Sequence, residues 1–281
     1  MGDLAQDTVV EGADGHYQAA LSPDWEIWGP NGGYVAAVAL RAAGAHSRHP
    51  RPASLLCHFL DVAGFEDVDI HVETLRESRR AESMRVSMTQ QGRRVLEALV
   101  WAVDGDLSGL EHDTLTAPDV PRVDELVPIQ DLFPAEDPRP RYTFFDNLEE
   151  RPVHWISDWE SRPAGVPVHQ CWYRFRHSPP PVDAWVTAGH LAILVDTFQW
   201  PAAVSGHAGG TVAYMAPSLD LACRFHRLEP VGDADWLLVE ARSPIAADGL
   251  VGGTASVWNT GGALLASGGQ QMLCRPAPGF A

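Results

Sequence analysis

The sequence predicts an α+β fold in which one unit, a helix followed by four strands, occurs twice. The first helix, "GPNGGYVAAVALRAAGAH" at 29–46, is introduced by glycines and precedes four segments with strand-like alternation. The second helix, "AGHLAILVDTFQWPA" at 188–202, precedes four segments in the same order. A chance match of one hairpin is common, but a helix and four strands repeated in one order indicate two copies of one α+β unit.

The expected strands are bounded by turn signals in both copies. The turn at "QQGR" separates the third and fourth strands of the first copy, and "TGG" separates those of the second. A further strand is expected at "HQCWYRF", with a counterpart around "HYQAALS" in the first copy. The four strands after each helix are expected at 55–60, 67–77, 81–90 and 94–104, and at 218–227, 235–246, 249–260 and 263–275.

The two copies predict two domains with a connecting segment between them. The stretch that follows the first copy is rich in proline and acidic residues, which is typical of a linker rather than of a core. We expect a first domain over 1–112, a Pro-rich acidic linker over 113–140 and a second domain over 141–281.

Composition and charge exclude several classes of protein. The content of hydrophobic residues, 45% of 281, is that of an ordinary globular protein. The formal net charge of −17 opposes nucleic-acid binding, which needs a broad basic surface. No segment approaches the roughly 20 apolar residues that span a bilayer, and the first residues contain no targeting signal. We therefore expect a cytoplasmic protein with neither a nucleic-acid nor a membrane partner.

The four cysteines indicate neither a disulfide framework nor a metal centre. They are far apart, with no C-x-x-C pair and no histidine at metal-ligand spacing. We expect buried free thiols, no metal site and no cofactor.

Asp196 is a charged residue in an otherwise apolar segment of the second helix. The segment around it is apolar on all sides, and such a helix is normally buried. A buried carboxylate is costly unless it has hydrogen bonds, a shifted pKa or a chemical function. The sequence therefore marks Asp196 as a candidate functional residue.

The order and spacing of these segments resemble the double-hotdog architecture of the acyl-CoA thioesterase II (TesB-like) family. The resemblance covers most of the chain and is clearest in "NGGYVAAVAL", "CHFL", "SLDLACRFHR" and "LLASGGQQMLCR". It implies two tandem antiparallel sheets, each wrapped around a central helix, and the hydrolysis of acyl-CoA. Assembly into a homo-oligomer is a further implication of the resemblance.

The resemblance implies a catalytic set of Asp196, Ser218 and Gln270. The family position of Ser218 is commonly threonine, and both residues offer one hydroxyl. Neighbouring residues of a strand face opposite sides, so a slip of one residue would exchange Gln270 for Gln271. Alignment on "LLAS" favours Gln270.

Thioester hydrolysis needs an activated water, a site for the developing oxyanion and exclusion of bulk solvent. Desolvation would raise the pKa of Asp196 from about 3.9 and make it a better general base near neutrality. Direct attack of Asp196 on the carbonyl carbon, through an anhydride, is the alternative mechanism.

The substrate-binding residues expected from the sequence are Asn31, Gly32, Gly33 and His58. In "PNGGY", Asn31 is a suitable N-cap, and the two glycines allow a substrate to approach the backbone N–H groups of the helix N-terminus. A cap with close helix packing is an equally good interpretation of this motif. His58 belongs to "CHFL" and resembles a family position near the site.

Two other functions are compatible with a hotdog fold. Hotdog hydratases pair an aspartate with a histidine five residues later, but the fifth residue after Asp196 is Pro201. A non-catalytic acyl-CoA binding or regulatory module would need the fold without the base. The joint occurrence of aspartate, serine and glutamine in the expected order favours the enzyme.

Overall fold

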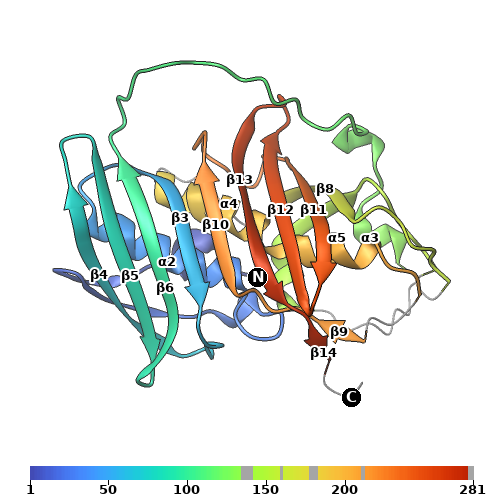
Figure 1. Cartoon of the computed structure of the whole chain (residues 1–281). Coiled ribbons are helices and arrows are strands. Elements are labelled where there is room, and N and C mark those ends of the chain that lie inside the picture. The colour runs from blue at the N-terminus through green and yellow to red at the C-terminus, as the bar shows by residue number, and fades with distance from the viewer. Residues whose placement is uncertain (134–141, 159–160, 177–182, 210–212, 278–281) are drawn as a thin grey trace.

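A computed structural model describes residues 1–133, 142–158, 161–176, 183–209 and 213–277 of the chain. Twelve of the described strands form one antiparallel sheet in the order β1-β2-β4-β5-β6-β3-β10-β13-β12-β11-β8-β7 (Figure 1). The two central strands, β3 and β10, pair with Cys57 opposite Leu221. The sheet is therefore continuous across the junction between the two copies of the repeated unit.

The first six strands of the chain form one half of this sheet, and six of the later strands form the other. The first half contains β1 (Glu11–Ala13), β2 (His16–Ala20), β3 (Arg51–Phe59), β4 (Asp67–Glu77), β5 (Ala81–Gln90) and β6 (Arg93–Val103). The second half contains β7 (Leu148–Pro152), β8 (Val168–Phe175), β10 (Asp220–Phe225), β11 (Leu237–Ala247), β12 (Leu250–Asn259) and β13 (Leu264–Leu273). The short strands β9 (Tyr214–Met215) and β14 (Arg275–Pro276) pair separately.

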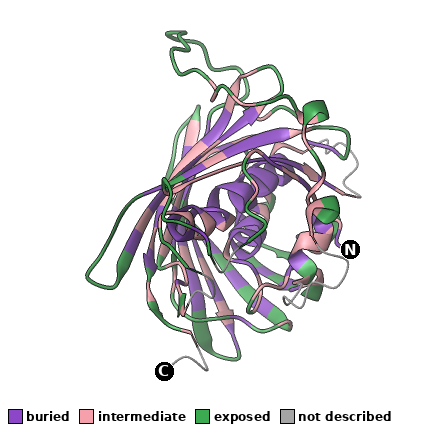
Figure 2. Ribbon diagram, turned by 90° about the vertical axis from the view of Figure 1, so that its right-hand side faces the viewer, coloured by how far each residue is buried: buried purple, intermediate pink, exposed green. Residues whose placement is uncertain are grey.

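The sheet curves around two helices, which Figure 2 shows as buried ribbons enclosed by the strands. They are α2 (Gly32–His46) and α4 (Ala184–Thr197), and the smaller helices are α1 (Leu4–Asp7), α3 (Ile129–Leu132) and α5 (Gln199–Ser205). Three short 3-10 turns lie at Pro23–Trp25, Val123–Glu125 and Thr143–Asn147. This arrangement is the double-hotdog, α+β fold that the family resemblance implies, with the two expected sheets joined through β3 and β10 into one. None of the helices in the described ranges is long and apolar enough to cross a membrane.

Helices α2 and α4 run antiparallel and touch along their length. At one end Gly33 lies against Ile193, where an added Cβ would come within 2.6 Å of the Ile193 Cα. At the other end Arg41 forms an ion pair with Asp183, the N-cap of α4. Small residues such as Gly33, Gly189 and Ala37 let the two helices lie close together, and the antiparallel arrangement places the N-terminus of α2 beside the C-terminal turn of α4.

The second helix breaks one turn earlier than the sequence pattern indicates. The pattern extends to position 202, but α4 ends at Thr197, and Phe198 separates it from α5 with φ −101° and ψ 7°. The cause is Pro201, which has no N–H and whose ring would collide with the Thr197 carbonyl in a continuous helix. The break places Asp196 in the last turn of α4.

Part of the segment expected to be a linker packs on the second half of the sheet. Trp172, Leu238 and Trp258 form an apolar cluster covered by side chains of this segment, among them Val120 and Val123. The indole nitrogen of Trp172 donates to the Pro121 carbonyl at 3.1 Å. Residues 134–140 of the expected linker lie outside the described residues, as does position 141, where the second domain is expected to begin.

Candidate active site

The Asp196 carboxylate lies between the C-terminal turn of α4 and the N-terminus of α2. Its Oδ2 accepts a hydrogen bond from the Gly33 backbone N–H at 2.7 Å, and its Oδ1 accepts one from the Ser218 hydroxyl at 3.3 Å. The residue is only 5% exposed. One half of the chain thus supplies the carboxylate, and the other half supplies a backbone donor for it.

Ser218 and Gln270 complete a connected group with Asp196. The Ser218 hydroxyl lies 2.9 Å from the Gln270 Oε1, and the Gln270 Nε2 donates to the Asp196 backbone carbonyl at 2.9 Å. Since a serine hydroxyl has one proton, it serves the carboxylate and the amide oxygen in alternation or shares the proton between them. The structure brings together the three residues that the sequence assigned to the catalytic set.

The local register of β10 and β13 determines which glutamine faces inward. Ser218 forms an isolated bridge with Met272, which is buried on the helix side of the sheet. Gln270 is also buried there, at 7% exposure, whereas Gln271 is only partly buried and lies in sequence between these two inward-facing residues. Because successive side chains of a strand alternate, Gln270 is the glutamine that meets Asp196.

The environment of Asp196 favours a carboxyl group that is a base near neutral pH. Burial raises the pKa of Asp196 to about 6, against the lowering effect of hydrogen bonds from the Gly33 N–H and the Ser218 hydroxyl. Above pH 6 the group is mostly ionised, yet it binds a proton much more readily than an aspartate in water does.

The first turn of α2 contains one backbone donor that no described group accepts. The side chain of Asn31 caps the Tyr34 N–H at 3.0 Å, the Asn31 carbonyl accepts from Val35, and the Gly33 N–H binds Asp196. Among the described residues, no acceptor is found for the Gly32 N–H. A Cβ at Gly32 would lie 3.0 Å from the Asp196 Oδ2, so the glycine keeps this approach open.

The structure corrects the expectation that His58 lies at the site. Along β3 the residues Leu55 and Cys57 are buried and face the helices, so His58 points to the opposite, exposed face of the sheet. Its neighbour Phe59 lies at the site instead, with its ring tip 3.1 Å from the position of a Cβ on Gly32. The alternation within "LLCHFL" was the sequence signal that could have placed His58 outside.

Two polar residues next to Asp196 were not found by sequence reasoning. The Thr197 hydroxyl donates to the Ile193 carbonyl at 2.7 Å and accepts from the Asn31 Nδ2 at 3.2 Å, which links the ends of α4 and α2. The Gln199 Nε2 donates to the Val195 carbonyl at 2.7 Å. Their proximity in sequence to Asp196 was the only signal available.

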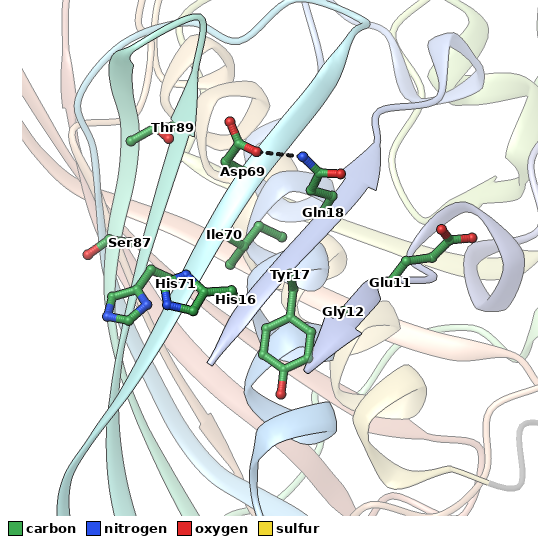
Figure 3. Close-up of a pocket in the computed structure, with 10 residues that line it drawn as sticks. All are labelled: Glu11, Gly12, His16, Tyr17, Gln18, Asp69, Ile70, His71, Ser87 and Thr89. Atoms are coloured by element: carbon green, nitrogen blue, oxygen red, sulfur yellow. Dashed lines mark hydrogen bonds between the residues drawn. The ribbon is translucent and has the colours of Figure 1, made fainter. Parts of the chain in front are cut away.

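A surface pocket of about 340 Å³ lies elsewhere, over β1, β2, β4 and β5. Figure 3 shows its side chains, with Gln18 donating to Asp69 and the rings of His16 and His71 side by side. Neither Asp196, Ser218 nor Gln270 lines it. No group of three or more His, Cys, Asp or Glu side chains suited to a metal ion occurs within the described ranges.

Comparison with known families identifies both halves of the chain. The model of the acyl-CoA thioesterase N-terminal domain matches residues 21–103, and that of the acyl-CoA thioesterase C-terminal domain matches residues 123–274. The chain belongs to the acyl-CoA thioesterase family. As a member of this family it is a thioester hydrolase whose substrates are acyl-CoA thioesters.

Solved structures share the fold of this acyl-CoA thioesterase over nearly its full length. An acyl-CoA thioesterase II from Mycobacterium marinum is 22% identical, with a TM-score of 0.77 and coverage of 98% of this chain and 99% of that chain. A hotdog-fold protein of unknown function from Alicyclobacillus acidocaldarius is 21% identical, with a TM-score of 0.79 and 98% coverage of both chains. The tesB protein of Mycobacterium avium subspecies paratuberculosis is 20% identical, with a TM-score of 0.75 and coverage of 97% and 98%.

Proposed function

We propose that the protein hydrolyses acyl-CoA thioesters to a free acid and CoA by means of a water molecule that Asp196 activates. The observation that carries this proposal is a buried carboxylate held by the Gly33 N–H and the Ser218 hydroxyl, whose pKa is raised to about 6. Such a group is ionised at neutral pH and still basic enough to remove a proton from water as the water attacks.

Hydrolysis at this site proceeds through a tetrahedral intermediate. The water oxygen bonds to the thioester carbonyl carbon while Asp196 accepts a proton from the water. When the tetrahedral intermediate collapses, the carbon–sulfur bond breaks and CoA leaves as a thiolate, which takes up the proton held by Asp196 and so restores the base. Ser218 and Gln270 hold the carboxylate and the backbone of Asp196 in place, since both are hydrogen-bonded to it directly.

The oxyanion of the intermediate is assigned to the N-terminus of α2. The Gly32 N–H lies in the first turn of the helix, where unpaired donors and the helix dipole favour a negative charge. The neighbouring Gly33 N–H is already bound to Asp196, so Gly32 supplies the free donor. Asn31 supports this arrangement as the N-cap of the helix.

One site in each chain is proposed, because the other end of the helix pair is built differently. There Gly44 of α2 faces Trp185 of α4, whose indole ring lies 2.6 Å from the position of a Cβ on the glycine. The Arg41–Asp183 ion pair occupies the same end. These side chains occupy the position where the pseudo-twofold repeat would place a second site.

The test is the release of free thiol from a panel of acyl-CoA substrates, short to long and including aryl thioesters. We expect Asp196→Asn to lose at least about a hundredfold in kcat, the scale of losing a general base. Asp183→Asn is the matched control, since it changes an aspartate of the same helix at the opposite end and retains a good N-cap. A substitution at Asp196 that leaves the rate unchanged would refute the proposed role.

Isotope labelling separates the general base from the nucleophile. In a single turnover in ¹⁸O water, a general-base reaction places the label in the released acid. Attack by Asp196 would form an anhydride, and opening of this anhydride by water at the aspartyl carbonyl would place ¹⁸O in the protein. We expect label in the acid and none in Asp196, as measured by mass spectrometry of the intact protein.

A further inference from the structure

Gln199 is a fully buried amide three residues after Asp196. It begins α5 and has 0% of its surface exposed. Its Nε2 donates to the Val195 carbonyl, one of the last four carbonyls of α4, which lack partners within the helix. A carbonyl oxygen only accepts hydrogen bonds, so the NH₂ group must face Val195 and the Oε1 must point the other way.

The Gln199 Oε1 lies next to Gly253, the cross-strand partner of Gln270. A Cβ on Gly253 of β12 would be 2.2 Å from this oxygen, so the amide occupies the space that a side chain at position 253 would fill. Gly253 is opposite Gln270 in the β12–β13 register, and cross-strand partners project from the same face of a sheet. Gln199 therefore adjoins the group formed by Asp196, Ser218 and Gln270.

Within the described part of the chain, no donor serves the Gln199 Oε1. The Gly253 Cα offers at most a weak C–H contact. A buried amide oxygen without a donor is unfavourable, whereas a methionine of similar shape would avoid this cost. A donor that arrives with the reactants would satisfy the oxygen.

The proposed hydrolytic water has two protons and needs two acceptors. Asp196 takes the first. The Gln270 Nε2 is a donor bound to the Asp196 carbonyl, and one of the two lone pairs of the Gln270 Oε1 accepts from Ser218, whereas among the described residues no donor serves either lone pair of the Gln199 Oε1. We propose that the Gln199 Oε1 accepts the second proton of the water in a hydrogen bond and so fixes the direction of its attack. This inference rests on the proposed function and adds a fourth residue in contact with the reacting atoms.

The test replaces Gln199 with methionine, which preserves size and removes the amide. We expect kcat to fall roughly tenfold, the effect of one lost hydrogen bond in the transition state, with KM unchanged. The pH dependence of kcat should keep its limb near 6, because the direct partners of Asp196 are untouched. Gln90→Met is the matched control. Gln90 is 2% exposed and, among the described residues, its amide is hydrogen-bonded to the 64–66 loop alone, so this variant reports the structural cost of losing a buried glutamine.

The outcomes distinguish this inference from the proposed function. If Asp196→Asn is inactive but Gln199→Met retains the wild-type kcat, the role of Gln199 is refuted and that of Asp196 stands. A raised KM at unchanged kcat, or a shifted pH limb, would likewise overturn it, by showing that Gln199 binds substrate or merely supports the site. If Asp196→Asn is fully active, the proposed function itself fails.

A structural measurement covers the case in which Gln199→Met does not fold. The wild-type protein would be crystallised with a non-hydrolysable thioether analogue of its acyl-CoA substrate. We expect a water within hydrogen-bond distance of both the Asp196 carboxylate and the Gln199 Oε1. A water bound to Asp196 whose second partner is Ser218 would overturn the inference.

Discussion

Replacing Asp196 with asparagine is expected to stabilise the protein at neutral and alkaline pH. In the folded protein, burial raises the pKa of this carboxyl from 3.8 to about 6. Asparagine has nearly the same shape and carries no charge. Its Oδ1 can accept from the Gly33 N–H, and its Nδ2 can donate to the Ser218 Oγ, so both contacts of the carboxylate have a counterpart.

The sign of the effect follows from the raised pKa. A group that binds its proton more tightly when folded favours the folded state below its unfolded pKa, and that contribution is lost as the pH rises through the folded pKa. Moving the pKa from 3.8 to about 6 corresponds to roughly 3 kcal/mol. The variant should therefore gain roughly 3 kcal/mol relative to the wild type between pH 4 and pH 8, most of it between pH 4 and 6.

Urea unfolding of both proteins at a series of pH values measures this difference. Every other titrating group is common to the two proteins, so the change in the difference with pH isolates Asp196. A difference that stays constant from pH 4 to pH 8, or that favours the wild type as the pH rises, would show that the carboxyl is not destabilised by burial. The reasoning about its basicity would then fail as well.

Two further predictions concern the same carboxylate. The kcat/KM of the wild type should rise with pH through about 6 and then level off, because Asp196 acts as a base only when it is deprotonated. A kcat/KM that falls over this range would exclude Asp196 as the general base. Gly33→Ala should destabilise the protein by more than about 1 kcal/mol, since the new Cβ would lie 2.6 Å from the Ile193 Cα. The same substitution should move the rise in kcat/KM to higher pH, because it forces the Gly33 N–H away from the Asp196 carboxylate. Gly105→Ala, whose Cβ would meet only Pro50 at an ordinary 3.6 Å, is the control in urea unfolding and pH–rate measurements.

The parts of the fold that sequence could predict are those with a local signal. The repeated helix and strands follow from periodicity, and Pro201 contains the information that breaks the second helix. The pairing of β3 with β10 has no such signal, because it joins residues more than 150 positions apart. The domain limits of 1–112, 113–140 and 141–281 stay a prediction.

The candidate site was predictable only where side-chain type was informative. Asp196 stood out as a lone charge in an apolar helix, but Ser218 and Gln270 are ordinary strand residues that only the family resemblance singled out. The Gly33 N–H that donates to the carboxylate is a backbone group, which every residue except proline has, so the residue type at position 33 does not reveal it. The proposed role of Gln199 has no signal in the sequence, because it depends on the direction of one oxygen, which is determined by the carbonyl to which the amide nitrogen donates.

The hydrogen bond from Gly33 to Asp196 makes the chemistry sensitive to how the chain is assembled. The donor lies in the part of the chain that matches the N-terminal family domain, and the acceptor lies in the part that matches the C-terminal one. Neither part alone contains both atoms. In the proposed mechanism, turnover therefore depends on correct docking of the two halves. A molecule with both halves folded but separated by an ångström or two would have native secondary structure and no activity.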